Sequence, residues 1–138
     1  MKSFIVASST FLFLIWAFLQ GIQYDTIDYK QSESTNIVQM YAQQARQEGL
    51  FTESIKKEMI EKIKERTQLE DSSIEVVELT STQKCRKDTF SENDQITYNV
   101  RILIDNVTIG LSLLGILPED NQYWYTIKGS VSSEKVCE

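Results

Sequence analysis

The hydrophobic pattern divides the chain into an apolar N-terminal stretch and a mixed remainder. Residues 3–24 carry no Asp, Glu, Lys or Arg. A helix over this stretch is about 33 Å long at about 1.5 Å per residue, close to the ~30 Å hydrocarbon layer of a bilayer. The pattern therefore predicts a transmembrane anchor over residues 1–24, whose apolar side chains face lipid. These side chains are those of Phe11, Leu12, Phe13, Leu14, Ile15, Trp16, Phe18 and Leu19.

Two other interpretations of this stretch stay open. It is also compatible with a secretory signal peptide, in which Lys2 is the positively charged region, and with the buried core helix of a globular domain. The residues that follow the apolar run are Gln20-Gly21-Ile22-Gln23, which is not a small-x-small cleavage site. This favours an anchor that is not cleaved.

The charges on either side of the apolar stretch indicate its orientation. Lys2 precedes it, and Asp25 and Asp28 follow it. The positive-inside rule then predicts a single-pass protein of the cell membrane, with the N-terminus in the cytoplasm and residues 25–138 outside it. Because Lys2 is one of the 14 basic residues and all 20 acidic residues follow the anchor, residues 25–138 carry a net charge of −7. Anionic lipid repels such a domain.

Two helices are expected before the first strand. Neither Pro nor Gly occurs in residues 22–48, so the pattern predicts one helix over residues 3–48, whose second half (25–48) is an amphipathic stem that Gly49 ends. A break near Gly21 or in residues 31–34, which gives two helices, is the alternative. Thr52 is a good N-cap for a second helix over residues 52–68. The apolar stripe of the stem consists of Ile37, Val38, Tyr41, Ala42 and Ala45.

Alternating residues then predict strands over residues 73–80, 95–104, 107–113 and 122–131. The first of these has an irregular alternation that indicates a bulge. This order of elements predicts an α+β fold, with an antiparallel sheet of three or four strands within residues 73–131 packed on the helices. The clearest alternation places one set of side chains of the second strand on one face, namely Ile96, Tyr98, Val100, Ile102 and Ile104.

Residues 109–117 are apolar and contain two glycines, so two interpretations compete. One is a buried strand followed by a tight corner. The other is a loop that contacts a neighbouring protein or the membrane. The candidate partner contacts are Ile109, Leu111, Leu114, Ile116 and Leu117.

Composition limits the chemistry. The absence of His from the sequence excludes His-based catalysis and His metal ligands, and a net charge of −6 argues against binding to nucleic acid. The carboxylates of Asp88, Glu92 and Asp94 are close in sequence but lack the order of an EF-hand. We therefore expect no enzymatic activity, cofactor, metal site or small-molecule substrate.

The two cysteines are Cys85 and Cys137, both outside the apolar stretch. In an oxidising location they are able to form one disulfide, which closes a loop of about 53 residues and is worth roughly 4 kcal/mol in the chain-entropy model. Two unpaired thiols are the alternative.

Two local patterns resemble a known family. Residues 41–52 (Tyr-Ala-Gln-Gln-Ala-Arg-Gln-Glu-Gly-Leu-Phe-Thr), followed by a short helix, resemble the segment next to the membrane in TadE-like pseudopilins of Gram-positive bacteria. The Gly- and Ser-containing residues 128–135 resemble the tail of that group, and the order of elements is that of pilin-like proteins. The chain departs from filament-forming pilins, which carry a Glu near the start of the apolar helix, because its first Glu is Glu33.

The resemblance implies a structural or assembly subunit, such as a minor pilin, of a bacterial surface filament, secretion apparatus or conjugation apparatus. Its expected partners are membrane lipid and, through the N-terminal helix, like subunits or other proteins of the pilus or secretion machine. The alternative function is that of a bitopic membrane protein with an extracytoplasmic module that binds a ligand or a protein. The two functions differ in whether the N-terminal helices contact one another.

Overall fold

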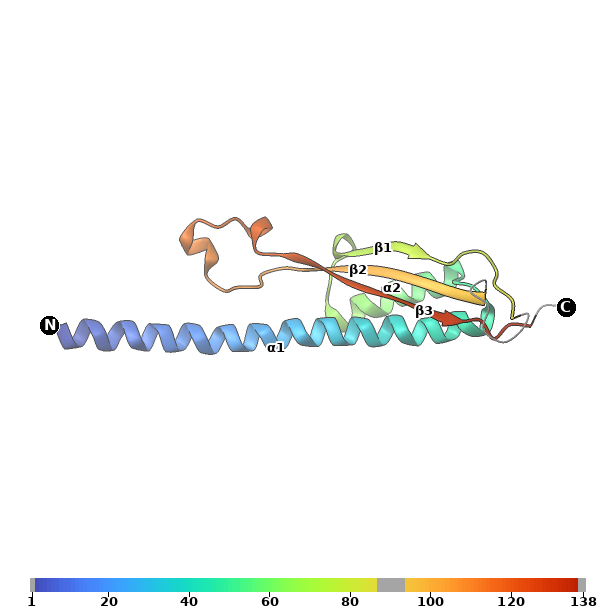
Figure 1. The fold of residues 1–138 in the computed structure, drawn as a ribbon. Helices are drawn as coiled ribbons and strands as arrows, with labels where there is room; N and C mark the ends of the chain where they lie inside the picture. Colours follow the sequence, from blue (N-terminus) through green and yellow to red (C-terminus); the bar gives the residue numbers. More distant parts are fainter. Residues whose placement is uncertain (1, 87–93, 137–138) are drawn as a thin grey trace. The chain divides into compact units, whose positions relative to one another are not determined.

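The computed structural model describes residues 2–86 and 94–136 of the chain. A long helix, α1 (Lys2–Glu48), is followed by a second helix, α2 (Glu53–Thr67), and by strands β1 (Ile74–Leu79), β2 (Gln95–Ile104) and β3 (Tyr123–Ser132) (Figure 1). The strands form a three-stranded antiparallel sheet in the order β1-β2-β3. The predicted α+β layout, with a long helix, a short helix and a small antiparallel sheet, is therefore confirmed.

The chain divides into two compact units. In the described residues, unit 1 comprises residues 2–30 and 104–123, and unit 2 comprises residues 31–86, 94–103 and 124–136. Each unit combines part of α1 with a segment that lies far away in sequence.

Helix α1 runs without interruption from Lys2 to Glu48, so the alternative with a break near Gly21 or in residues 31–34 is wrong. Gly49 ends the helix in the left-handed conformation, with φ of 81°, and its amide donates to the carbonyl of Ala45 at 2.8 Å. Glycine reaches this conformation without the cost that a Cβ atom imposes. The predicted helix end is thus confirmed.

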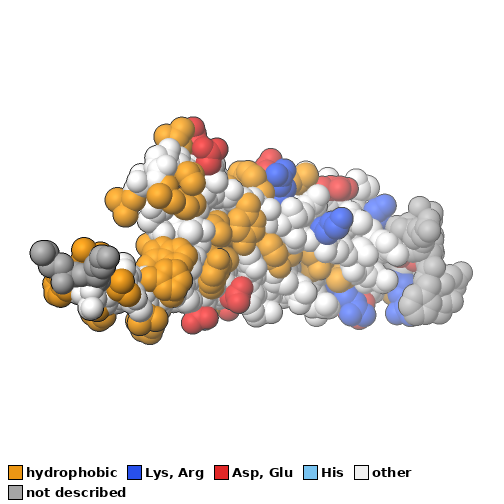
Figure 2. Space-filling model, turned by 60° about the vertical axis from the view of Figure 1, so that its left-hand side comes forward, with side chains coloured by type: hydrophobic (Ala, Val, Ile, Leu, Met, Phe, Trp, Pro, Cys, Tyr) orange, Lys and Arg blue, Asp and Glu red, His pale blue; other side chains and the backbone are white. Residues whose placement is uncertain are grey.

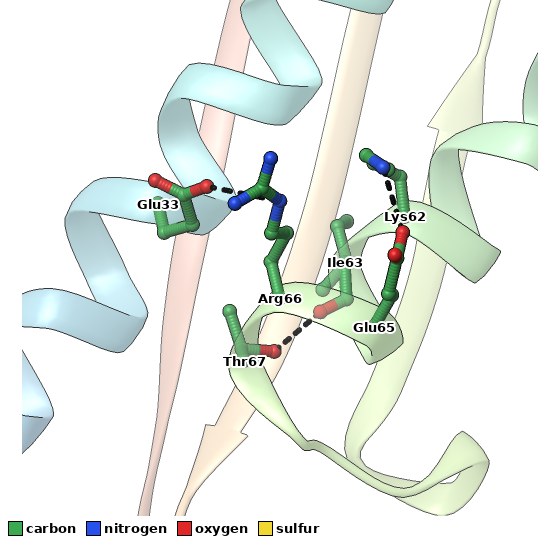
Figure 3. Close-up of polar contacts among 6 residues, drawn as sticks. All are labelled: Glu33, Lys62, Ile63, Glu65, Arg66 and Thr67. Carbon is green, nitrogen blue, oxygen red and sulfur yellow. Dashed lines mark hydrogen bonds and ion pairs between the residues drawn. The ribbon is translucent and has the colours of Figure 1, made fainter.

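Helix α2 is defined by its two ends and by one buried face. The Thr52 hydroxyl accepts a hydrogen bond from the amide of Ile55 at 3.2 Å, as expected of an N-cap, and Gln68 ends the helix with φ of 56°. Lys62 pairs with Glu65 within α2, and Arg66 pairs with Glu33 of α1 (Figure 3). The buried residues of α2 are Ile55, Met59, Ile63 and Thr67.

The core of unit 2 lies between the stem half of α1, helix α2 and one face of the sheet. The five residues of β2 that the alternation assigned to one face are all buried, which confirms that prediction. The expected irregularity in β1 lies between Val76 and Glu78, where the register with β2 shifts. The stem contributes Val38, Tyr41, Ala42 and Ala45 to this core.

Charged contacts on α2 add little to this packing (Figure 3). The Glu33 carboxylate on α1 lies 3.9 Å from Nε of Arg66, and Lys62 Nζ donates to Glu65 at 2.6 Å. The Lys62 hydrogen bond holds the pKa of Glu65 below its ordinary value. The exposed fraction of these side chains ranges from 27% for Glu33 to 66% for Glu65, and ion pairs that water reaches contribute little to stability. Apolar burial therefore accounts for the fold of unit 2.

The predicted strand over residues 107–113 is wrong. The structure has short 3-10 helices at Leu111–Leu114 and Pro118–Asp120 in place of a strand between β2 and β3. Glycines with positive φ flank the first of them, Gly110 at 84° and Gly115 at 77°, and such dihedrals cannot continue a strand. The interpretation of residues 109–117 as a buried strand is wrong for the same reason, and the Leu113 side chain is 90% exposed.

The end of α1 holds two distant segments of unit 2 together, at a place that we call the tail corner (residues 46–49, 84–86 and 133–135). The amide of Lys84 donates to the carbonyl of Gly49 at 2.8 Å, and the Ser133 hydroxyl donates to the carbonyl of Lys84 at 2.7 Å. The amide of Arg86 donates to the carbonyl of Lys135 at 2.7 Å. The chain next to Cys85 therefore lies beside the chain that leads to Cys137. Cys137 itself lies outside the described residues, so the disulfide stays a prediction.

Candidate functional site

The apolar side chains of the first half of α1 are uncovered in this chain. All eight predicted anchor residues are exposed, and hydrophobic side chains gather over this part of the helix (Figure 2). Within the described residues, α1 is the one helix long and apolar enough to cross a membrane, with a mean hydropathy of 1.9 over its most apolar window. The core-helix interpretation is therefore wrong, and α1 is compatible with membrane anchoring.

Three side chains that carry N–H donors lie along one line of this apolar stretch. Trp16, Gln20 and Gln23 are separated by four and three residues, a spacing that puts them on one face of a helix. All three donate hydrogen bonds to the backbone of residues 106–109. We call these three residues the polar ladder and residues 105–122 the lobe. Both belong to unit 1.

Gln20 makes the most complete of these contacts. Its Nε2 donates to the carbonyl of Val107 at 2.9 Å, and its Oε1 accepts from the amide of Ile109 at 2.9 Å. The Gln20 side chain is 6% exposed although it lies between apolar residues that are uncovered. The side-chain amide of Gln20 thus bonds backbone groups of Val107 and Ile109 that a neighbouring strand would otherwise bond. These groups are therefore not available to extend the sheet.

The other two ladder residues bond the lobe on either side of Gln20 along α1. Gln23 Nε2 donates to the carbonyl of Asn106 at 2.8 Å, and Trp16 Nε1 donates to the carbonyl of Ile109 at 2.9 Å. With a rise of about 1.5 Å per residue, the ladder extends about 10 Å along the helix. The first leg of the lobe therefore runs along α1 toward its apolar end.

Asn121 closes the lobe at its base. Its Oδ1 accepts from the amide of Thr108 at 2.9 Å, and its Nδ2 donates to the carbonyl of Thr108 at 2.8 Å. The amide of Val107 donates to the carbonyl of Asn121 at 3.2 Å. The two legs of the lobe are thus joined by one side chain, and the residues between them form a closed loop.

The five predicted partner contacts all lie in the lobe, but they differ in exposure. Ile109 and Leu111 are half-buried, whereas Leu114, Ile116 and Leu117 are exposed. Leu113, which lies in the same segment and is 90% exposed, was not among the predicted contacts. The polar ladder was also missed, although the spacing of its residues in an apolar helix is a signal that the sequence carries.

Two hollows of the described surface offer little chemistry. One, of about 230 Å³, lies in the lobe and is lined by no charged side chain. The other, of about 470 Å³, lies beside β1 and β2. Its lining includes Glu78 and Lys84, and the hydroxyls of Thr80 and Thr97 bond each other at 3.0 Å.

In the described ranges, no group of three His, Cys, Asp or Glu side chains is placed to hold a metal ion. Of the three carboxylates that are close in sequence, Asp88 and Glu92 lie outside the described residues. The features that stand out are therefore the exposed half of α1 and the lobe tied to it. Comparison of the chain with protein-family models, with curated proteins and with solved structures gave no match.

Proposed function

We propose that this chain is a pilin-like subunit, anchored in the membrane by the first half of α1, that takes part in a bacterial surface filament, secretion apparatus or conjugation apparatus. One observation carries the proposal. A helix with an uncovered apolar first half continues without a break into a stem that packs in a small α+β unit.

The apolar half of α1 offers a surface for contact with like helices. Ala17 and Gly21 are exposed and lie one turn apart, and a Cβ atom added at Gly21 would meet nothing within 4 Å. Small residues at this spacing let two helices approach closely in a membrane. Each follows a ladder residue and lies about 100° around the helix from it, so the lobe leaves this face open.

The proposed location follows the charges and the cysteines. Lys2 on one side of the anchor, with Asp25 and Asp28 on the other, favours an N-terminus in the cytoplasm. Residues 25–138 then lie outside the cytoplasm, where the predicted disulfide at the tail corner is able to form. The close approach of the Arg86 and Lys135 backbones supports that pairing.

Crosslinking between anchors tests the proposal. Cysteine is introduced singly at each position of residues 11–19 in the full chain, and the membranes are oxidised and examined for covalent dimers. We expect dimers at positions that share one face with Ala17, such as Leu14, which lies three residues before it, because that face is free of the lobe. The unaltered chain is the control for crosslinks through Cys85 and Cys137.

The pattern of dimers separates the two functions. Dimers that recur every three or four residues support contact between like helices. If the membrane-bound chain forms no dimer at any of these positions, the subunit proposal fails, and a bitopic binding protein becomes the better interpretation.

A further inference from the structure

We infer that the lobe is a second membrane contact, which enters the interface between lipid headgroups and acyl chains beside α1 and places leucine side chains among the acyl chains. This inference rests on the proposed anchoring of α1 and adds an attachment that the anchor alone does not provide. Its occupant is lipid, and the argument comes from depth, backbone pairing and surface character.

The polar ladder fixes the depth of the lobe relative to the anchor. Gln23 lies where the uncharged stretch ends, two residues before Asp25, and Trp16 lies about 10 Å further along the helix axis. Because both side chains bond the lobe within residues 106–109, this part of the lobe occupies the same depth as residues 16–23 of α1. If residues 3–24 span the bilayer, the lobe enters the bilayer to a depth of about 5–10 Å, which is typical of interfacial segments.

The backbone of the lobe is paired in a way that suits such an environment. Polar backbone groups that leave water must find partners within the protein. The carbonyls of Asn106, Val107 and Ile109 accept from ladder side chains, and the amide of Ile109 donates to Gln20. Asn121 supplies partners for both backbone groups of Thr108. A loop in water would obtain these hydrogen bonds from solvent, so the buried amide of Gln20 is explained by a site with little water.

The surface of the lobe is apolar at its tip and acidic at its ends. Residues 107–118 carry no charge, whereas Asp105 precedes them and Glu119 and Asp120 follow. At the tip, Leu113 is 90% and Leu114 77% exposed, and hydrophobic side chains are visible on this segment (Figure 2). Transfer of such side chains from water to lipid lowers their free energy. The carboxylates at the ends of the lobe are costly to remove from water, so those ends stay in water.

A lobe in the interface also fixes which side of the anchor faces other helices. The lobe covers the ladder face of α1, so the face of Ala17 and Gly21 is left for protein contacts. The two attachments together hold α1 against rotation about its own axis. Each subunit then presents the same face to its neighbours.

A fluorescent probe at the tip tests the inference. p-Acetylphenylalanine replaces Leu113 in the full chain, and its ketone takes an NBD hydroxylamine without reaction at the native cysteines. The protein is reconstituted into phosphatidylcholine vesicles with and without lipids that carry a doxyl quencher on the acyl chain. The same probe at Phe11, which is exposed and lies about 120° around the helix from Ala17, reports on the anchor. At Val77, an exposed apolar residue of β1, it is the matched control for an apolar site in unit 2.

We expect doxyl lipids to remove most of the emission at Leu113 and at Phe11, and iodide in the water to quench the probe at Val77 alone. If iodide but not doxyl lipid quenches the probe at Leu113 while lipid still quenches the probe at Phe11, the lobe is not a membrane contact but the anchor stands. Protection at Leu113 from both quenchers also overturns the inference, since a second protein chain then covers the tip. Quenching of the probe at Phe11 by iodide instead of by lipid overturns both the anchor and the membrane contact of the lobe.

Discussion

Replacing Gly49 with alanine should lower the free energy of unfolding of unit 2 by about 3 kcal/mol. Gly49 has φ of 81°, and the left-handed conformation costs a residue with a Cβ atom about 1–2 kcal/mol. The added Cβ would also lie 2.6 Å from the backbone carbonyl oxygen of Lys84 and 3.2 Å from the side chain of Lys135. Forcing an atom into a packed site costs a further 1–3 kcal/mol or so. Urea unfolding of the full chain in a mild detergent, followed by the fluorescence of Trp124 on β3, measures the change.

A substitution at Gln68, in the same unit, separates the cost of the left-handed conformation from the cost of the close contacts at Gly49. Gln68, at the end of α2, also has a positive φ of 56°. Gln68→Gly should therefore stabilise unit 2 by about 1 kcal/mol, because it removes the conformational cost and no other contact. If Gly49→Ala lowers the free energy of unfolding by no more than Gln68→Gly raises it, the tail corner accommodates the added Cβ atom without cost. That result would contradict our account of the tail corner.

Removing the predicted Cys85–Cys137 bond should cost roughly 4 kcal/mol of unfolding free energy, since a loop of about 53 residues is then no longer closed in the unfolded chain. The tail corner supports the pairing, because the amide of Arg86 lies 2.7 Å from the carbonyl oxygen of Lys135. The unfolding of the unaltered chain is compared with that of the Cys85→Ala/Cys137→Ala variant by the same urea titration.

A reducing agent serves as the matched control. It should destabilise the unaltered chain by the same amount and leave the double variant unchanged. If the intact mass of the unreduced protein shows two thiols, or if the reducing agent has no effect on the unaltered chain, the pairing is wrong.

Much of the fold was predictable because single patterns dominate long elements. The absence of Pro and Gly between Gly21 and Gly49 allowed one helix, and isolated Gly21 did not break it, since a helix tolerates one glycine at a cost of about 1 kcal/mol. The strict alternation of apolar residues in β2 matched its buried face. In both elements, local preference and burial point to the same structure.

The lobe was not predictable in the same way, because distant side chains decide its conformation. Residues 107–113 alternate like a strand, but Gln20 and Asn121 take the backbone hydrogen bonds that a neighbouring strand would need. Gln20 lies 89 residues before Ile109 in the sequence, and Asn121 lies 13 residues after Thr108. The alternation of apolar residues contains no sign of either partner. The exposure of Leu113 follows from this arrangement rather than from the pattern of apolar positions.

The central claim is that the first half of α1 stays on the chain and lies in lipid. The most direct test is the intact mass of the protein that remains in bacterial membranes after an alkaline carbonate wash, which removes peripheral proteins. We predict that the full chain, with residues 3–24 still attached, is found in the washed membranes. A chain that is released by the wash, or one that begins after Gly21, would contradict the account.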